Sequence, residues 1–299
     1  MPVIDEIVSR IQDWKGRNIT ILALSGGLTN TNYKVTVDAT PFFVRVPGES
    51  TEVLAIDRQN EYFNSKAAAT TDIGPQVLCY LPEFQAMVLE FLPGATMSNE
   101  SLNKPGMPTR IAKAIQRLHN GPRFFSDFNM FRLTEYYLDI CKQRGIRIPD
   151  GYPEKLATVG RIEQALMARP LPTVPCNNDL LAENYIDDGF SMRIIDYEYS
   201  GNNDPCFELG NTCQELGYDE AMIAEVCTVY FGSPSAGKIA RMKLNMIMSD
   251  VGWALWAAIQ AEVSKIQYNF WGWAVERWGR AVAKMDSPKF PAWLEDVKT

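Results

Sequence analysis

Two aspartates and an asparagine in the second half of the chain have side chains suited to phosphoryl transfer. Asn184 follows Asp179 by five residues, and Asp196 comes twelve residues later. Phosphoryl transfer needs a base for the acceptor hydroxyl and hard oxygen ligands for Mg²⁺, and these three side chains supply both. Taken alone, the run from Asn177 to Asp179 is equally interpreted as a turn whose side chains bond to their own backbone.

A glycine-containing segment in the first third of the chain is suited to binding phosphate. Leu24-Ser-Gly-Gly-Leu-Thr-Asn30 lies between two expected strands, where missing side chains let backbone N–H groups approach phosphate oxygens. Further on, Arg45 stands on the face of a strand opposite its apolar neighbours, and Glu61 follows on an expected helix. A strand cation paired with a helix glutamate is how kinases hold the phosphates of ATP. The alternative is a surface ion pair that contributes little to stability.

The elements that must position these residues fall into two lobes. In residues 1–92, apolar spacing and β-branched runs predict helices at 3–14 and 52–69 and strands at 19–24, 33–37, 42–46, 76–81 and 86–91. Leu92-Pro-Gly94 breaks the pattern, so we place the lobe boundary after residue 92. We expect residues 1–92 to form a nucleotide-binding lobe around a small antiparallel sheet.

The second lobe, residues 93–299, is expected to be mainly helical and to hold the catalytic and acceptor-binding residues. Helices are predicted at 107–119, 126–145, 153–168, 219–232 and 236–283, the last interrupted near Tyr268. A non-helical block covers 174–186 and 192–199, and Asp187-Asp-Gly189 between its halves predicts a hairpin. The fold class is therefore α+β.

Composition excludes several classes of protein. The 299 residues are 46% hydrophobic and 22% charged, which is typical of a folded globular protein. The net charge of −7 and the lack of a long basic stretch argue against nucleic acid as a partner. The apolar helical run 251–259 is too short to cross a bilayer, and the first residues lack the pattern of a signal peptide. We expect a cytoplasmic protein with no membrane partner.

Cysteine and histidine usage narrows the chemistry further. The six cysteines include no Cys-x-x-Cys pair, which argues against a disulfide framework or a thiolate zinc site. His119 is the only histidine, so a histidine-rich zinc site or a histidine-dependent hydrolase would depend on it alone. It stands before Asn120-Gly-Pro122, and we interpret it as an ordinary residue at the C-terminus of a helix.

Read in order, the motifs resemble the choline/ethanolamine kinase family, part of the protein-kinase-like group that includes aminoglycoside phosphotransferases. The resemblance runs from about residue 24 to residue 273. It is carried by Leu24-Ser-Gly-Gly-Leu-Thr-Asn30, Phe43-Val-Arg-Val46, Leu89-Glu-Phe-Leu-Pro-Gly94, Cys176-Asn-Asn-Asp-Leu180 with Asn184, Ile195-Asp-Tyr-Glu-Tyr-Ser200 and Phe207-Glu-Leu-Gly-Asn211. The resemblance implies a two-lobed protein-kinase-like fold and the use of ATP and Mg²⁺. Asn177 departs from the family, which usually has a histidine there as a brace for the loop.

The resemblance also implies a role for each matching position. Asp179 would be the catalytic base, and Asn184 and Asp196 the magnesium ligands, with Glu198 as a further partner of the metal. The cofactor-binding residues would be Ser25, Gly26, Gly27, Thr29, Asn30, Arg45, Glu61, Glu90, Phe91 and Leu92. Among them Arg45 would hold phosphates, Glu61 would orient it, and the last three would form a hinge whose backbone meets adenine.

Aromatic residues near the end of the chain suggest the acceptor. Trp253 and Trp256 are three residues apart on an expected helix and share a face, and such rings attract a quaternary ammonium. The alternative is that they are ordinary core residues. By resemblance the substrate-binding residues would be Tyr199, Glu215, Asp250, Trp253, Trp256, Tyr268 and Trp273. Asp250 replaces a family histidine with a carboxylate, which suits a cation.

Three hypotheses follow. The leading one is an ATP-dependent kinase that phosphorylates the hydroxyl of a small cationic alcohol, choline or ethanolamine. The second keeps the mechanism and changes the acceptor to thiamine or an aminoglycoside; an aminoglycoside would need several carboxylates rather than aromatic rings. The third is a nucleotide-binding module without catalysis, and the presence of Asp179, Asn184 and Asp196 together argues against it.

Overall fold

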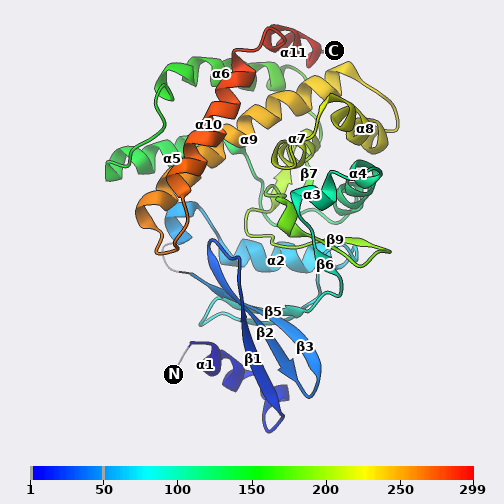
Figure 1. The fold of residues 1–299 in the computed structure, drawn as a ribbon, viewed down its shortest axis with the longest axis vertical. Helices are drawn as coiled ribbons and strands as arrows, with labels where there is room; N and C mark the ends of the chain where they lie inside the picture. The colour runs from blue at the N-terminus through cyan, green and yellow to red at the C-terminus, as the bar shows by residue number, and fades with distance from the viewer. Residues whose placement is uncertain (1–2, 49–50) are drawn as a thin grey trace.

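An antiparallel sheet lies at one end of the molecule and a bundle of helices at the other (Figure 1). The computed structural model describes residues 3–48 and 51–299. The sheet has the strand order β1-β2-β3-β5-β4, and each adjacent pair is antiparallel. Its strands are β1 (Ile19–Leu24), β2 (Asn30–Val37), β3 (Thr40–Pro47), β4 (Val77–Leu81) and β5 (Ala86–Glu90). The predicted α+β class is confirmed.

Side chains along each strand alternate between the two faces of the sheet, and the apolar side chains on one face form a small core. Val35, Val44 and Val88 are buried on one face, where Ile7 and Trp14 from the start of the chain cover them. Arg45 follows Val44 and therefore points to the opposite face. The N-terminal segment is a helix, α1 (Val3–Arg10), followed by a 3₁₀ turn, η1 (Gln12–Trp14), rather than the single helix predicted.

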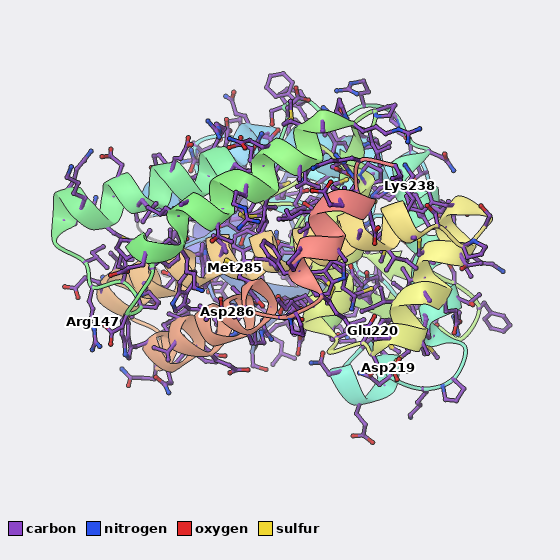
Figure 2. All side chains as sticks on the ribbon, turned by 90° about the horizontal axis from the view of Figure 1, so that it is seen from above. Arg147, Asp219, Glu220, Lys238, Met285 and Asp286 are labelled. Atoms are coloured by element: carbon purple, nitrogen blue, oxygen red, sulfur yellow. The ribbon has the colours of Figure 1, made fainter. Side chains whose placement is uncertain are left out.

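Most of the remaining chain is helical. The helices are α2 (Arg58–Ala69), α3 (Asn99–Leu102), α4 (Met107–His119), α5 (Met130–Arg144), α6 (Leu156–Ala168), α7 (Pro205–Glu215), α8 (Glu220–Phe231), α9 (Ala236–Val263), α10 (Phe270–Met285) and α11 (Phe290–Asp296). Figure 2 shows this helical part from above. The break predicted near Tyr268 separates α9 from α10. We find no described helix with the length and apolarity needed to cross a membrane.

Several boundaries differ from the prediction. Helix α2 begins at Arg58 rather than at 52, because the Asp57 side chain accepts from the N–H groups of Gln59 and Asn60; a 3₁₀ turn, η2 (Thr51–Leu54), precedes it. Helix α5 begins at 130 rather than 126, since Asn129 caps it in the same way. The prediction missed α7, although Asp204-Pro205 is a helix start signal and the polar residues Glu208, Asn211, Thr212 and Glu215 recur at helical spacing.

Short strands and turns connect the two parts. The hairpin predicted around 187–189 is present as β8 and β9. The short elements are β6 (Ala95–Thr96), β7 (Val174–Cys176), β8 (Tyr185–Asp187), β9 (Met192–Ile194), β10 (Gly201–Asn203), η3 (Pro153–Lys155) and η4 (Ala182–Asn184). The predicted lobe boundary after residue 92 falls between β5 and β6, and β6 pairs with β8 of the helical part.

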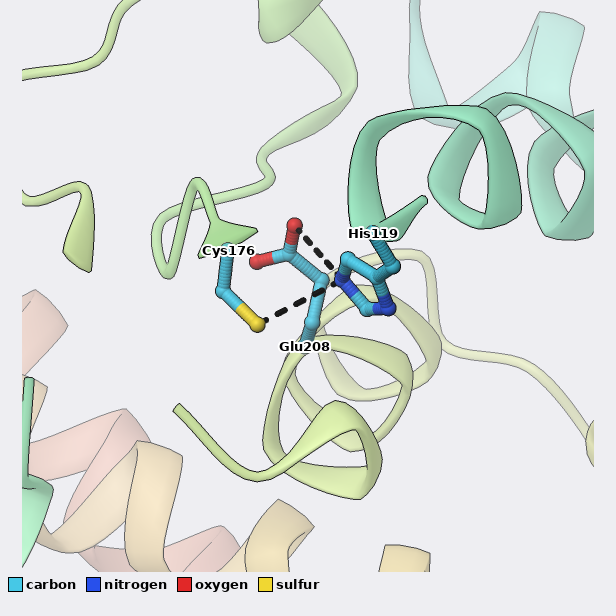
Figure 3. Close-up of side chains that lie close together, drawn as sticks. All are labelled: His119, Cys176 and Glu208. Carbon is cyan, nitrogen blue, oxygen red and sulfur yellow. Dashed lines mark hydrogen bonds and ion pairs between the residues drawn. The ribbon is translucent and has the colours of Figure 1, made fainter. Parts of the chain in front are cut away.

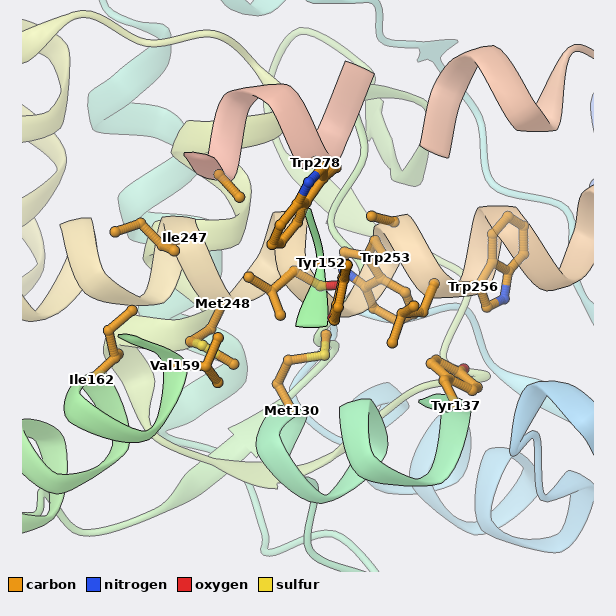
Figure 4. Packing of buried hydrophobic residues seen from close by; sticks show 14 of the residues in the cluster. Met130, Tyr137, Tyr152, Val159, Ile162, Ile247, Met248, Trp253, Trp256 and Trp278 are labelled. Carbon is orange, nitrogen blue, oxygen red and sulfur yellow. The ribbon is translucent and has the colours of Figure 1, made fainter. Parts of the chain in front are cut away.

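Helix α9 is the centre of the helical part and contacts α5, α7, α10 and α11. Its residues from 240 to 260 are buried without interruption, and its core partners include Tyr152, Val159 and Trp278 (Figure 4). Contact with α7 is so close that a Cβ at Gly210 would lie 2.6 Å from the backbone oxygen of Met242.

This contact gives a testable difference between two helical glycines. We expect Gly210→Ala to destabilise the protein by about 1–3 kcal/mol, because backbone must move to admit the methyl group. A Cβ at Gly160 in α6 meets nothing within 4 Å. Gly160→Ala should therefore stabilise the protein by about 0.5–1 kcal/mol through helix propensity. Chemical denaturation measures both, and equal effects would contradict the described packing of α7 on α9.

Candidate active site

The sheet and the helical part enclose a cavity of about 860 Å³, and the predicted site residues gather along it. All of them line the cavity except Glu61 and Asp250. The lining includes Ser25, Gly26, Gly27, Thr29, Asn30, Arg45, Glu90, Phe91, Leu92, Asp179, Asn184, Asp196, Tyr199, Glu215, Trp253, Trp256, Tyr268 and Trp273. Segments as distant in sequence as the loop after β1 and the start of α10 therefore meet at one place.

The glycine-containing loop connects β1 to β2 at one wall of the cavity. Gly26 has a φ of +105°, and a Cβ at Gly27 would lie 2.2 Å from the backbone oxygen of Asn30. Glycine is thus required at both positions. The loop is held to the helical part by Glu198, which accepts from Thr29 Oγ1 at 2.8 Å and from Asn30 Nδ2 at 3.0 Å.

Arg45 forms a buried bridge across the cavity. Its Nη1 lies 2.7 Å from Glu61 Oε1 on α2 and 2.7 Å from Asp196 Oδ1 in the segment after β9. The side chains of Arg45 and Glu61 are 5% and 1% exposed, so the alternative of a surface ion pair is wrong. Burial alone would lower the pKa of Arg45, but Asp196 and Glu61 raise it above its usual value.

The loop that carries Asp179 is fixed by Asn177. The Asn177 side chain accepts from the N–H of Asp179 at 3.1 Å and donates to the backbone oxygens of Ile195 and Asp196 at 3.1 and 2.7 Å. Asn184 in turn donates to the Asp179 backbone oxygen at 2.7 Å. One side chain thereby joins the segments of the predicted base and of the predicted metal ligand.

Glu208 of α7 also supports this loop, and its side chain lies beside those of His119 and Cys176 (Figure 3). Its carboxylate accepts from the N–H groups of Asn177 and Asn178 at 2.9 and 2.6 Å. His119 Nε2 lies 3.5 Å from Glu208 and 3.4 Å from Cys176 Sγ, while its Nδ1 meets the Tyr230 hydroxyl. His119 ends α4, as predicted. Glu208 belongs to the motif Phe207-Glu-Leu-Gly-Asn211, but nothing in the sequence indicated its role in supporting this loop.

The carboxylates along the cavity change each other's proton affinity. Burial raises the pKa of Asp179 well above its usual value, and Asp196, Glu198 and Glu215 raise it further, against the opposite effect of Arg277. Burial, with Asp196, also raises the pKa of Glu198 to about 7. A carboxylate with a raised pKa is a better proton acceptor near neutral pH.

One part of the cavity, here called the aromatic end, is lined by tryptophan and tyrosine side chains. Trp256 Nε1 donates to the Tyr199 hydroxyl at 2.6 Å, and Trp256 stands perpendicular to Trp273 with 5.7 Å between ring centroids. Tyr268 meets the other edge of this group, 5.8 Å from Trp273. Trp253 and Trp256 both line the cavity and belong to the helical core (Figure 4). The two interpretations of these tryptophans, core and cavity wall, therefore hold together.

Asp250 lies behind this end rather than in it, so its predicted direct contact with substrate does not fit its position. It is fully buried, accepts from Gln214 at 2.7 Å and pairs with Arg280. Burial raises the pKa of Asp250 to about 6, against the opposite effects of Arg280 and Arg277. Asp250 lies about one helical turn before Trp253 in a stretch of α9 that is buried throughout, so its pairing with Arg280 could not be read from sequence alone.

Arg277 is a cavity residue that the sequence analysis missed. Its guanidinium stacks 4.2 Å from the Trp273 ring centroid and binds both oxygens of Glu215 at 2.6 and 2.9 Å. Glu215 lines the cavity as predicted, but its charge is already paired. The spacing of four residues between Trp273 and Arg277 places them on one helix face and is a signal that could have been used.

The antiparallel sheet, the mainly helical part and the cavity between them define a kinase-like phosphotransferase fold. A sequence profile of the choline/ethanolamine kinase family matches residues 21–227. Because that match covers more than half of the 299 residues, the chain belongs to the choline/ethanolamine kinase family.

Several individual proteins are similar to this chain in sequence or in fold. Human ethanolamine kinase 2 is 26% identical over 303 residues, which cover 89% of this chain and 76% of that protein. A choline/ethanolamine kinase family protein from Mesorhizobium loti superposes with a TM-score of 0.86 and 31% identity over 99% of both chains. LicA in complex with AMP has a TM-score of 0.78 at 24% identity, over 95% of this chain and 96% of that one.

The contacts of Asn177 generate a prediction for the site. We expect Asn177→Ala to lower kcat, because two loops lose a shared support, and to cost about 1–3 kcal/mol of stability through unpaired buried backbone groups. Asn177→His should retain more activity than Asn177→Ala, since a ring nitrogen can replace part of the bonding.

Asn103 offers a matched control, because its side chain also donates to two backbone oxygens, those of Asn99 and Leu216. Asn103→Ala should lose stability with kcat unchanged. Steady-state kinetics and thermal denaturation of the three variants test this. Equal loss of kcat in the two alanine variants would show that Asn177 has no particular role in placing Asp179.

Proposed function

We propose that this protein transfers the γ-phosphoryl group of ATP to the hydroxyl of choline or ethanolamine. The observation that carries the proposal is the arrangement along one cavity. The glycine-containing loop, Arg45, the aromatic group and the three residues Asp179, Asn184 and Asp196 all line the same cavity. A phosphate donor and a cationic alcohol bound in this cavity would meet beside a carboxylate.

Three features support ATP as the donor. Backbone N–H groups of the loop at Gly26 and Gly27 are free of side chains that would keep phosphates away. Arg45 presents a buried guanidinium to the same space, and guanidinium groups bind phosphate oxygens strongly. Phe91 and Leu92, directly after β5, would meet the adenine. AMP in the LicA complex supports nucleotide binding in this fold.

The residues present fit Mg²⁺. Asp196 and Asn184 offer carboxylate and amide oxygens, which this ion prefers. The Asn184 amide nitrogen donates to the Asp179 backbone, which leaves the amide oxygen for a cation. When bound, Mg²⁺ would neutralise charge on the transferring phosphates. The residues that would hold it are therefore fixed by the same contacts that fix the base.

Asp179 is our proposed base for the acceptor hydroxyl. It is half-buried at the cavity wall, and its loop is held from three sides by Asn177, Asn184 and Glu208. Burial and the nearby carboxylates raise the pKa of Asp179, which increases its ability to accept a proton during transfer. In the proposed reaction the hydroxyl oxygen bonds to the γ-phosphorus as its proton passes to the Asp179 carboxylate. The bond from the γ-phosphorus to the β–γ bridging oxygen breaks, and ADP leaves.

The aromatic end supports a small cationic alcohol as acceptor. The Trp253 and Trp256 indole N–H groups are already bonded to Asn211 and Tyr199, so the rings offer their apolar surfaces. Such surfaces attract an ammonium without needing an N–H donor from it. An aminoglycoside would need several free carboxylates, but Glu215 is held by both nitrogens of Arg277. We therefore favour choline or ethanolamine over the polycationic alternative.

Substitution of the two aspartates should separate catalysis from nucleotide binding. Asp179→Ala should lower kcat by about 10²–10⁴ with the KM for ATP little changed, because its work is on the acceptor. Asp196→Asn should abolish turnover and weaken ATP binding more with Mg²⁺ than without it, since Asp196 also pairs with Arg45. Coupled kinase kinetics and calorimetric ATP titration with and without EDTA measure these effects.

Asp188→Asn is the control, because Asp188 is exposed in the turn between β8 and β9. It should leave all of these constants unchanged. Full activity of Asp196→Asn would contradict its role as a ligand. Loss of ATP binding in Asp179→Ala would mean that this residue is structural.

The aromatic end gives a prediction about the acceptor. Trp256→Ala should raise the KM for choline by roughly tenfold, equivalent to about 1.4 kcal/mol, with the KM for ATP unchanged. Ethanolamine should be affected less, since a primary ammonium can also donate hydrogen bonds to water. Initial rates with each amine at saturating ATP measure the difference.

Trp278→Ala is the matched control, because Trp278 is a buried core tryptophan that stacks on Tyr152 and does not line the cavity. It should lower thermal stability and leave both amine constants unchanged. If Trp256→Ala affects the two amines equally and behaves like Trp278→Ala, the aromatic end is core packing and the choline assignment fails.

A further inference from the structure

Arg58 is a buried cation that the functions assigned above do not use. It is the first residue of α2, and its side chain is 3% exposed. Its Nη1 lies 2.7 Å from Glu61 Oε2 and 3.2 Å from Glu198 Oε2. A buried charge is expensive unless it is paired, so this position needs both carboxylates.

The two partners of Arg58 belong to different parts of the molecule. Glu61 shares α2 with Arg58 and gives its other oxygen to Arg45. Glu198 lies in the segment after β9 and holds the glycine-containing loop through Thr29 and Asn30. Arg58 is thus the link between the cation at the predicted phosphate site and the loop that covers that site.

The pairs form a continuous series of alternating charges. It runs from Asp196 through Arg45, Glu61 and Arg58 to Glu198, with Nη1···O distances between 2.7 and 3.2 Å. Three carboxylates and two guanidinium groups leave one net negative charge. Without Arg58, Glu61 and Glu198 would face each other with Arg45 as the single remaining cation of the series.

We propose that Arg58 is a positioning residue that couples the glycine-containing loop to Arg45, so that loop placement and orientation of the phosphate-binding cation occur together. This inference rests on the proposed function, since it assigns the nucleotide to this end of the cavity. Arg58 does not line the cavity and acts through Glu61 and Glu198. Substitution of Arg58 should therefore weaken nucleotide binding and leave acceptor binding unchanged.

The first test removes the charge and the guanidinium while keeping an unbranched apolar stem. Arg58→Met should raise both the KM and the directly measured dissociation constant of ATP by about tenfold or more, with the KM for choline or ethanolamine within about twofold. Arg58→Lys should recover part of the loss, because one ammonium can still bridge two carboxylates. Calorimetric ATP titration and steady-state kinetics provide the two readouts.

Arg241 supplies a matched control, because it is also a buried arginine, paired with Asp204 and two backbone oxygens away from the cavity. Arg241→Met should lose stability without changing the KM for ATP. If Arg58→Met gives the same pattern as Arg241→Met, or if Arg58→Lys recovers nothing, Arg58 is only structural and the proposal is overturned.

A double-mutant cycle tests whether Arg58 acts on the loop through Glu198. It uses Arg58→Lys, so it can be carried out even if Arg58→Met does not fold. Thr29→Val removes the loop's hydroxyl bond to Glu198. Combined with Arg58→Lys, its effect on ATP affinity should be smaller than in the wild-type background, since both changes loosen one linkage. Additive effects would overturn the coupling. A wild-type protein that binds ATP but phosphorylates neither amine would instead count against the proposed function, and the binding cycle would still decide the role of Arg58.

Discussion

The buried guanidinium of Arg45 is the interaction on which the arrangement of the two parts depends. Its carboxylate partners come from α2 and from the segment after β9, so a strand of the sheet, a helix and the hairpin region meet at one nitrogen atom. A buried ion pair adds little net stability compared with apolar packing, but breaking one side of it is costly. The Arg45 ion pairs therefore fix the sheet against the helical part at the predicted phosphate site, which lies between them.

A second constraint on the structure lies in helix α9, whose tryptophans belong both to the core and to the cavity wall. Trp253 and Trp256 pack with the helical core, yet both line the aromatic end. Behind them Asp250 pairs with Arg280, and Arg277 stacks on Trp273 while it holds Glu215. The shape and the charge of the aromatic end are thus set by buried contacts, so changes in binding and in stability are coupled there.

Sequence patterns were sufficient for the main elements and for most residues of the cavity. Alternation in the strands and the motif at Asp179, Asn184 and Asp196 were local signals. Helix α7 was missed although its polar residues recur at helical spacing after Asp204-Pro205. That Glu208 faces the Asp179 loop rather than solvent is a tertiary contact, which spacing alone does not give. Asp250 was misplaced, since only the packing of α9 decides which face it occupies. Cross-lobe contacts such as that of Arg58 with Glu198, 140 residues apart, carry no local signal.

We propose that one cavity brings ATP and a small cationic alcohol to Asp179. To test this, the protein is incubated with ATP and Mg²⁺ in separate reactions that contain choline, ethanolamine, thiamine or kanamycin. Mass spectrometry then detects which alcohol has been phosphorylated. We expect phosphocholine or phosphoethanolamine as the main product, formed only when Mg²⁺ is present. Kanamycin phosphate as the main product, or hydrolysis of ATP with no phosphorylated alcohol, would contradict this proposal.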